Sequence, residues 1–398
     1  MVPAIRLKYN NTFTDGQYRQ FLQQLAVKQG TEAPPFRVAE TPVFVPKALG
    51  DKLLQAGEDV INTILQPDFK TRTEKSIPKH LHVPGENAHS HFLIVDFGIC
   101  LDENGELTPR LIELQGFPSL FAYQELMAQA YRDHFYVPEA YHNFFNGFDR
   151  NTYFNFLRDI IVGPYDPQHV ILLEVLPHQQ KTRVDFYYTG EQLGIPVVCV
   201  TELIHEGKKL FYLRDGVKTS VKRIYNRVIF EDLERYKEQL GPMGHLFHEL
   251  DVEWIPHPNW FYRISKYTLP MINSAYAPKS WFLHELPVLP KDLDQYVLKP
   301  LFSFAGSGVK IDVTPADIDA VKDPENWILQ QKVHYAPVVQ TPEGNAICEI
   351  RLMYGWPEGA ARPVLMHNLA RLSKGRMIGV GFNDGQTWVG GSCAFFEP

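Results

Sequence analysis

Residues 296–311 of this chain have the sequence YVLKPLFSFAGSGVKI, and the other motifs can be arranged around this stretch. An apolar run carries Lys299 to the end of an expected strand, a short Gly/Ser/Ala loop follows, and residues 309–313 alternate as a second strand. We therefore expect a β-hairpin with a glycine-rich tip. Because glycine has no Cβ, the main-chain N–H groups of such a tip can approach phosphate oxygens, and a lysine at its base adds positive charge.

Two interpretations of this hairpin stay open on its residues alone. It is either a phosphate-binding tip or an ordinary β-hairpin with a solvated lysine, because glycine-rich tips are common in hairpins. It is not a Walker A loop, since no Gly-Lys-Ser/Thr sequence opens a helix after it. The rest of the chain has to decide between the two interpretations.

The composition is that of an ordinary globular protein of two or three domains. The 398 residues are 44% hydrophobic and 21% charged, and the formal net charge of −7 is spread without a basic block, so neither nucleic acid nor a membrane is expected as a partner. We expect a cytoplasmic protein, because the sequence lacks a signal-peptide core and an apolar run of the roughly 18 residues that a spanning helix needs. The four cysteines have no CxxC spacing, which favours buried thiols over a zinc or disulfide framework.

A second stretch, residues 92–115, predicts a site for a divalent cation. Its sequence is FLIVDFGICLDENGELTPRLIELQ, in which two apolar strands flank an Asn-Gly pair, the strongest two-residue hairpin signal. If that turn sets the register, Asp96 lies directly opposite Glu113, and Gln115 follows on the same face. Three side-chain oxygens on one patch suit a hard cation. The alternative is a solvent-facing polar stripe, and Pro109 is a position where the register can slip.

Residues 161–255 contain the strand–helix–strand order of a βαβ unit, which implies a parallel sheet covered by helices. They lack a GxGxxG fingerprint, so dinucleotide binding is not expected. Arg223 and Arg227 lie four residues apart near a strand end. They either hold a carboxylate or phosphate, or form surface ion pairs with Glu231 or Asp232.

Taken together, these motifs resemble the circularly permuted ATP-grasp ligases. The resemblance is closest to the synthetase domain of glutathionylspermidine synthase and more distant to eukaryotic-type glutathione synthetase, and it rests on the order of short motifs between Asp96 and Arg371. The matched motifs are a Val-Asp-Phe strand, a Glu-Leu-Gln strand, a Lys-x-x-Leu-Pro element, a Lys-Pro strand with a Gly-rich loop, an Ile-Leu-Gln-Gln strand and a late arginine.

The resemblance implies a role for each matched residue. Asp96, Glu113 and Gln115 would hold Mg²⁺, with Gln115 standing where the family usually has the shorter asparagine. Arg371 would be the catalytic arginine that faces the reacting phosphoryl group. The ATP-binding residues would be Lys266, Lys299, Ser303, Gly306, Ser307, Gly308, Gln330 and Gln331.

The resemblance also implies an α+β chain of circularly permuted ATP-grasp type with an inserted α/β domain. Its expected parts are an N-terminal segment with the metal-binding hairpin (1–160), a central α/β substrate domain (161–255) and a nucleotide-binding ATP-grasp domain (256–398). The expected reaction uses ATP to convert a small-molecule carboxylate into an acyl phosphate, which an amine attacks to give an amide. The alternatives are a nucleotide-binding protein without ligase activity and a carboxylate kinase that releases the acyl phosphate.

Overall fold

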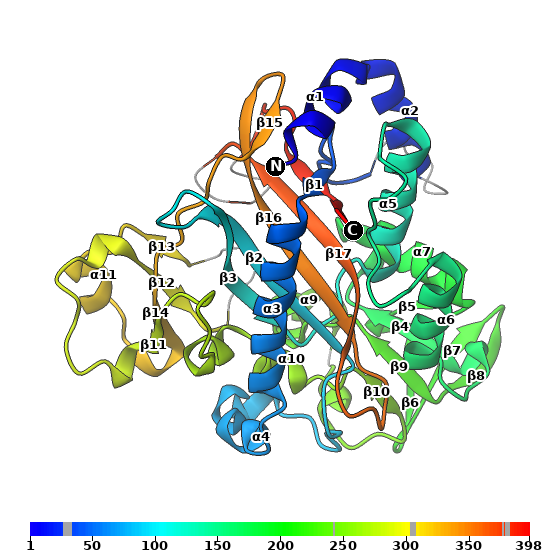
Figure 1. Cartoon of the computed structure of the whole chain (residues 1–398). Coiled ribbons are helices and arrows are strands. Elements are labelled where there is room, and N and C mark those ends of the chain that lie inside the picture. The colour runs from blue at the N-terminus through cyan, green and yellow to red at the C-terminus, as the bar shows by residue number, and fades with distance from the viewer. Residues whose placement is uncertain (27–33, 242, 303–307, 376–377, 379–382) are drawn as a thin grey trace.

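The computed structural model describes residues 1–26, 34–241, 243–302, 308–375, 378 and 383–398. Both helices and strands are present along these residues, as expected for a chain that mixes α and β structure (Figure 1). The α-helices are α1 (Pro3–Thr12), α2 (Asp15–Leu25), α3 (Lys47–Ile64), α4 (Phe69–Arg72), α5 (Phe121–His134), α6 (Arg150–Ile161), α7 (Arg183–Leu193), α8 (Phe230–Arg235), α9 (Lys237–Leu240), α10 (Trp260–Arg263) and α11 (Pro315–Asp319). Within the described residues, none of the helices combines the length and the apolar character that crossing a membrane requires.

A central sheet joins strands that are far apart in the sequence. Its order is β18-β17-β16-β2-β3, with antiparallel neighbours, and β15 pairs with β16. Its strands are β2 (Phe92–Leu101), β3 (Leu107–Gln115), β15 (Val339–Thr341), β16 (Gly344–Gly355), β17 (Val364–Ser373) and β18 (Gly390–Ser392). The sheet thus takes strands from both the expected N-terminal segment and the expected nucleotide-binding domain, whose boundaries stay a prediction.

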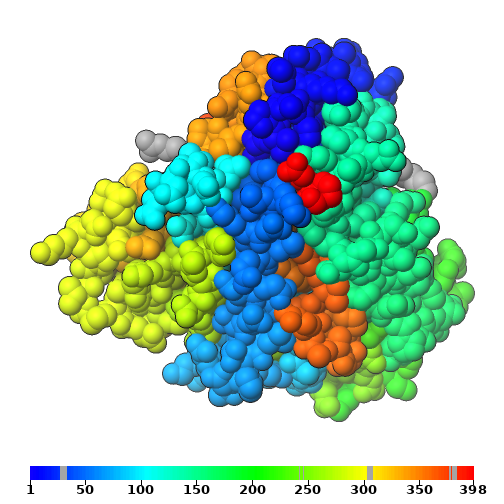
Figure 2. All heavy atoms as spheres, viewed as in Figure 1, coloured from blue at the N-terminus to red at the C-terminus, as the bar shows by residue number. Residues whose placement is uncertain are grey.

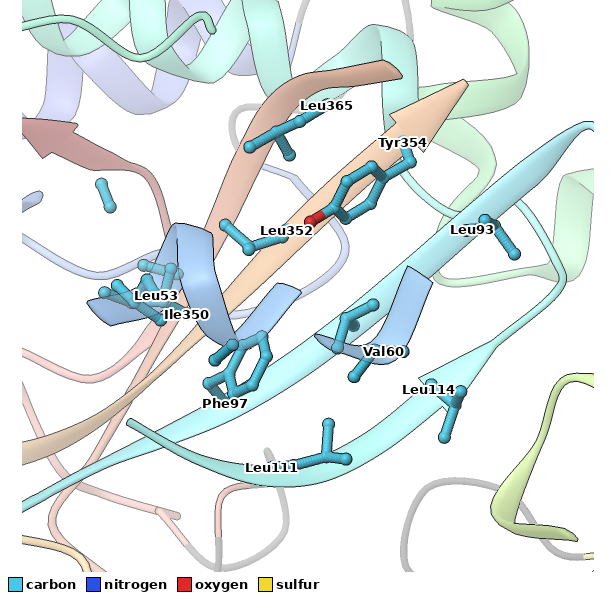
Figure 3. Close-up of a cluster of buried hydrophobic side chains, with 14 of the residues drawn as sticks. Leu53, Val60, Leu93, Phe97, Leu111, Leu114, Ile350, Leu352, Tyr354 and Leu365 are labelled. Atoms are coloured by element: carbon cyan, nitrogen blue, oxygen red, sulfur yellow. The ribbon is translucent and has the colours of Figure 1, made fainter. Parts of the chain in front are cut away.

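The two faces of the central sheet differ because side chains alternate along each strand. On one face, Leu93, Phe97 and Leu352 are buried beneath Leu53 and Val60 of α3 (Figure 3). The buried apolar residues of α3 recur every three or four positions, so one stripe of this helix covers the sheet. The opposite face carries the charged residues from which the candidate site is built.

A parallel sheet of order β10-β9-β4-β5 forms the α/β unit. Its strands are β4 (Val170–Glu174), β5 (Val197–Cys199), β9 (Arg223–Asn226) and β10 (Glu253–Ile255), and α7 connects β4 to β5. The predicted strand–helix–strand unit is therefore confirmed. The chain adds β5 on one side of β4 and later β9 on the other, so the β4/β9 boundary is a topological switch point, where sheets of this kind commonly bind ligands.

The hairpin predicted at residues 296–311 is present in a second antiparallel sheet, of order β11-β14-β12-β13. Figure 2 shows this part of the chain as a lobe at the left of the molecule, beside the β2–β3 hairpin. Its strands are β11 (Ser280–Phe282), β12 (Tyr296–Pro300), β13 (Lys310–Ile311) and β14 (Trp327–Gln331). The second strand of the hairpin, β13, is shorter than expected.

Two smaller sheets complete the described fold. One is an antiparallel meander of β6 (Ile204–Glu206), β7 (Lys209–Arg214) and β8 (Val217–Val221). The other pairs β1 (Val43–Val45) in parallel with β19 (Ala394–Phe396). All four cysteines are free and buried, as their spacing predicted.

Candidate active site

The pairing of β2 with β3 places Asp96 directly opposite Glu113, as the sequence predicted. The strands do not close on a two-residue turn, however, because the loop spans residues 102–106, and this shifts the register by one. A β-bulge at Ile112 adds one residue to β3 and shifts the register back. Glu113 and Gln115 then lie on the same face of β3, so the predicted arrangement of the three oxygen-bearing side chains is confirmed.

Lys299 reaches this hairpin at the bulge. Its Nζ donates to the main-chain carbonyl oxygen of Ile112 at 3.2 Å and to Oε1 of Gln330 at 2.6 Å. Burial lowers the pKa of Lys299 to about 8, and the carboxylate of Glu113 opposes that shift while the charge of Lys266 adds to it. The end of β12 is therefore fixed against β3 by a buried lysine.

Lys266 approaches the same hairpin from the 3-10 helix η7 (Lys266–Met271), and its Nζ lies 3.2 Å from Oε1 of Glu113. Gly116, the residue after β3, makes this close approach possible. A Cβ at Gly116 would lie 2.5 Å from the carbonyl oxygen of Trp260, at the start of α10. A larger residue here would push α10 away and move the lysine that follows it.

Asp96 is bound by two arginines on the polar face of the central sheet. Arg351 donates from Nε to Oδ1 of Asp96 at 2.6 Å and from Nη2 to Oδ2 at 2.7 Å. Arg371 donates from Nη2 to Oδ2 of Asp96 at 3.0 Å and to Oε2 of Glu349 at 2.7 Å. The hydroxyl of Tyr335 donates to the other oxygen of Glu349. We call this set, Arg351–Asp96–Arg371–Glu349–Tyr335, the arginine–carboxylate chain.

Burial and neighbouring charges act in opposite directions on the pKa values in the arginine–carboxylate chain. Burial acts to raise the pKa of Asp96, which is 1% exposed, but Arg351 and Arg371 hold that pKa below its ordinary value. Burial raises the pKa of Glu349 against the opposing charge of Arg371. Burial acts to lower the pKa of Arg371, but the surrounding carboxylates, Glu349 first and Asp96 and Glu113 after it, raise that pKa above the ordinary value. Arg371 therefore stays charged, and its buried Nε has no hydrogen-bond partner within the described residues.

The other predicted nucleotide-binding residues are divided between the site and its surroundings. Gln330 is 1% exposed and belongs to the site through its bond to Lys299. Gln331 is exposed, and its Oε1 accepts from the main-chain N–H of Lys279 at 3.3 Å. Gly308 is exposed with φ of 72°, a left-handed conformation that favours glycine. Three predicted residues lie outside the described part of the chain: Ser303, Gly306 and Ser307.

Sequence reasoning missed Glu349 and Arg351. A signal was present, because the two charged residues are two positions apart in a strand that is otherwise mostly apolar, and so share one face of β16. Their partners were not readable, since Arg351 and Asp96 are 255 residues apart and only the pairing of β16 with β2 brings them together.

The three predicted magnesium ligands differ in availability. Both carboxylate oxygens of Asp96 accept from arginines, whereas the side chain of Glu113 is 27% exposed and Gln115 is half-buried. Within the described ranges, no group of three or more His, Cys, Asp and Glu side chains has the geometry to hold a metal ion. Mg²⁺ commonly takes one or two carboxylates together with substrate phosphates. Glu113 and Gln115 fit an ion that arrives with a nucleotide, and Asp96 does not.

A second basic site lies at the switch point of the parallel sheet. Arg227 follows β9, is 4% exposed, and has its guanidinium carbon 4.9 Å from the ring centre of Phe117 and 5.3 Å from that of Phe186. Its Nε and Nη1 have no hydrogen-bond partner in the part of the chain that the structure describes. At the end of β4, burial raises the pKa of Glu174 to about 8, against the opposing charge of Arg227.

Arg223 and Arg227 do not act as a pair. Arg223 begins β9 and forms an ion pair with Glu253 at 3.0 Å, while Arg227 lies beyond the other end of the strand. Their side chains have different partners, since the guanidinium of Arg227 packs near aromatic rings instead of a carboxylate. The predicted surface ion pair is also wrong for Arg227, which is buried.

Comparisons with known proteins support the fold. No model of a protein family matches the chain, and no curated protein is similar to it in sequence. Among solved structures, the chain is similar to a glutathione synthetase-like effector from Globodera pallida in its apo form. The TM-score is 0.55 at 10% sequence identity, and the match covers 97% of this chain and 98% of the other. At that identity, the similarity shows a glutathione synthetase-like fold and nothing finer.

Proposed function

We propose that this protein is an ATP-dependent carboxylate–amine ligase of the circularly permuted ATP-grasp type, which joins its substrates through an acyl phosphate. The observation that carries the proposal is the convergence of three cations near Glu113. Lys266 comes from η7, Lys299 from β12 and Arg371 from β17, and each interacts electrostatically with this carboxylate. A fixed group of cations in a partly buried site stabilises the charge of a triphosphate and of a transferring phosphoryl group.

Each residue has a part in this proposal. Lys266 and Lys299 neutralise charge on the phosphates, and Gln330 keeps Lys299 in place. The positive charge of Arg371, whose Nε has no partner within the described residues, stabilises the charge that develops during phosphoryl transfer and during attack of the amine on the acyl phosphate. Glu113 and Gln115 would hold Mg²⁺, which neutralises phosphate charge when it is bound.

The second basic site supports a carboxylate substrate. Nε and Nη1 of Arg227 are charged donors without a partner in the described residues, and a carboxylate oxygen can accept from such a donor. Phe117, whose ring lies by Arg227, is two residues beyond Gln115, so the end of β3 connects this site to the three cations near Glu113. We propose that Arg227 anchors a carboxylate of one of the two small-molecule substrates.

A nucleotide-binding protein without ligase activity is the second candidate. It is favoured by the ion pairs of Asp96 with Arg351 and Arg371, because they occupy an acidic residue of the predicted metal site. The two candidates share nucleotide binding and differ in turnover, so binding and turnover have to be measured separately.

Nucleotide binding is tested by thermal unfolding and calorimetry with ATP on the wild type, Lys299→Ala and Lys266→Ala. Lys310→Ala is the matched control, because Lys310 is exposed on β13 of the same hairpin. ATP at 100 times its dissociation constant should stabilise the wild type by about 2.7 kcal/mol. Both site variants should bind more weakly and the control should not. Absence of any shift with ATP or ADP, with and without Mg²⁺, would refute the proposal.

Turnover is tested by ADP release from ATP with panels of carboxylates and amines. ADP and amide formed in equal amounts, and only with both substrates present, indicate a ligase. ADP formed with a carboxylate alone indicates a carboxylate kinase. Nucleotide binding without ADP release from any pair favours the second candidate.

A further inference from the structure

The arginine–carboxylate chain is built into the register of the central sheet. Arg351 lies directly opposite Asp96 across the β16–β2 ladder, and Glu349 lies directly opposite Arg371 across the β16–β17 ladder. Directly opposed residues have Cβ atoms about 4.5–5.5 Å apart, so the strands themselves bring each pair into contact. Because Glu349 and Arg351 are two residues apart on β16, the two pairs also share one face of the sheet.

Asp96 has no oxygen that is free of an arginine. The side-on contact with Arg351 uses one donor on each oxygen and fixes the plane of the carboxylate, and Arg371 adds a second donor on Oδ2. A Mg²⁺ ligand would have to place an oxygen atom about 2.0–2.1 Å from the ion. At Asp96 such an ion would lie against two guanidinium groups, whose charges repel it.

The guanidinium of Arg371 is held through Nη2 only. Its Nη2 is shared by Asp96 and Glu349, while its Nε has no partner within the described residues and its side chain is 35% exposed. Glu349 is fixed in turn by Tyr335, whose ring passes close over Gly98 of β2. A Cβ at Gly98 would lie 2.6 Å from that ring, so the glycine leaves the room that Tyr335 needs.

We propose that Asp96 is a positioning residue for Arg371, fixed in that role by Arg351, and is not a ligand of Mg²⁺. Asp96 and Glu349 both accept from Nη2 of Arg371 and so orient its guanidinium before any ligand arrives. The proposal rests on the proposed function only for the identity of the anion that Arg371 meets. It departs from the metal-binding role that the family resemblance implied for Asp96, and it leaves Glu113 and Gln115 as the residues that face the ion.

The first test measures ATP affinity by calorimetry in excess Mg²⁺ and in EDTA. The ratio of the two affinities measures how much Mg²⁺ contributes to ATP binding. It is insensitive to a loss of stability, because both affinities are measured on the same folded variant. Glu113→Gln should reduce the ratio, whereas Asp96→Asn should keep the wild-type ratio. A ratio that falls equally in both variants would overturn the proposal, because Asp96 would then behave as a ligand.

The second test needs no nucleotide. Phenylglyoxal labelling of arginines is followed by peptide mass spectrometry, with Arg362, whose side chain is 49% exposed, as internal reference. Labelling of Arg371 relative to Arg362 should rise several-fold in Asp96→Asn. It should also rise in Arg351→Lys, which keeps the charge but loses the side-on pair. Unchanged labelling of Arg371 in both variants would overturn the positioning role.

The two tests separate this proposal from the proposed function. If the wild type binds no ATP in either buffer, the proposed function fails, and the labelling of Arg371 still decides whether Asp96 positions it. If ATP binds and Arg371 labelling is unchanged in both variants, the proposed function stands and the positioning role fails.

Discussion

The polar face of the central sheet and the switch point of the parallel sheet both hold arginines, but the two regions provide these arginines with different partners. In the central sheet, each oxygen of Asp96 and Glu349 accepts a hydrogen bond, so the network keeps its geometry without a ligand. At the switch point, the guanidinium of Arg227 lies near two aromatic rings, and two of its nitrogen atoms have no partner in the described structure. The first arrangement positions a residue. The second leaves donors of a buried arginine without a partner in the described residues, at a cost in desolvation free energy that the proposed carboxylate would offset.

The strongest way to break this contrast is Asp96→Asn. The substitution leaves Arg351 buried without its charge partner, and removing one member of a buried ion pair typically costs about 3–5 kcal/mol. We expect the free energy of unfolding, measured by urea denaturation, to fall by that amount. A loss as small as that of an exposed surface substitution would show that the network is not a structural element.

Gly98→Ala should have a smaller effect on the same network. The added Cβ meets the ring of Tyr335, and overpacking of this kind typically costs about 1–3 kcal/mol. Gly244→Ala is the control, because no heavy atom of the described residues lies within 4 Å of the corresponding Cβ. Equal unfolding free energies for the two variants would contradict the close packing of Tyr335 over β2.

Raising the pH above 8 should weaken ATP binding and raise the free energy of unfolding, in both cases because Lys299 loses its proton. Its pKa of about 8 means that its charge is lost above that pH, so ATP affinity should fall by up to about tenfold per pH unit between pH 8 and 9. The unfolded lysine keeps its proton up to its ordinary pKa of 10.5, so the folded state binds fewer protons between these values. The contribution of Lys299 to the free energy of unfolding therefore rises with pH in this window.

Calorimetry with ATP between pH 7 and 9 checks this prediction, with Lys299→Arg as the comparison. Arginine stays charged throughout, so the pH dependence should largely disappear in that variant. A wild-type affinity that is constant to pH 9 would place the charge of Lys299 outside the nucleotide site.

The smallest change in stability is expected for Arg227→Met. The carboxyl groups of Glu174 and Asp185 both interact electrostatically with Arg227. At pH 7 most of Glu174 is protonated, since its pKa is about 8, and Asp185 accepts main-chain hydrogen bonds from Leu120 and Tyr123. Replacing the arginine by an apolar residue therefore leaves little buried negative charge without a compensating group. The free energy of unfolding should change by less than about 1 kcal/mol. Binding of the carboxylate substrate should be lost. A destabilisation as large as that of Asp96→Asn would make Arg227 a structural residue like those of the central sheet.

The sequence was informative where neighbouring residues decide the structure. Strand alternation and a turn signal predicted the Asp96–Glu113 pairing, although the longer loop and the bulge at Ile112 compensate for each other in a way that no local pattern indicates. The strand of Lys299 and the βαβ unit followed from local periodicity as well. The partners of Asp96 did not, because the pairing of β2 with β16 depends on the whole intervening chain.

The strand order of the central sheet also determines when, during translation, the sheet can form. Asp96 and Arg351 are separated by 255 residues, so at 5–20 residues per second a ribosome needs roughly 10–50 s between them. Throughout that time the edge of β2 that later pairs with β16 is an unpaired, largely apolar strand edge, the kind of surface through which nascent chains associate. Mutations that slow the pairing of β16 with β2 should therefore reduce the yield of soluble protein before any other effect is seen. Chaperones that shield strand edges should act on this chain during translation, well before any ligand can stabilise it.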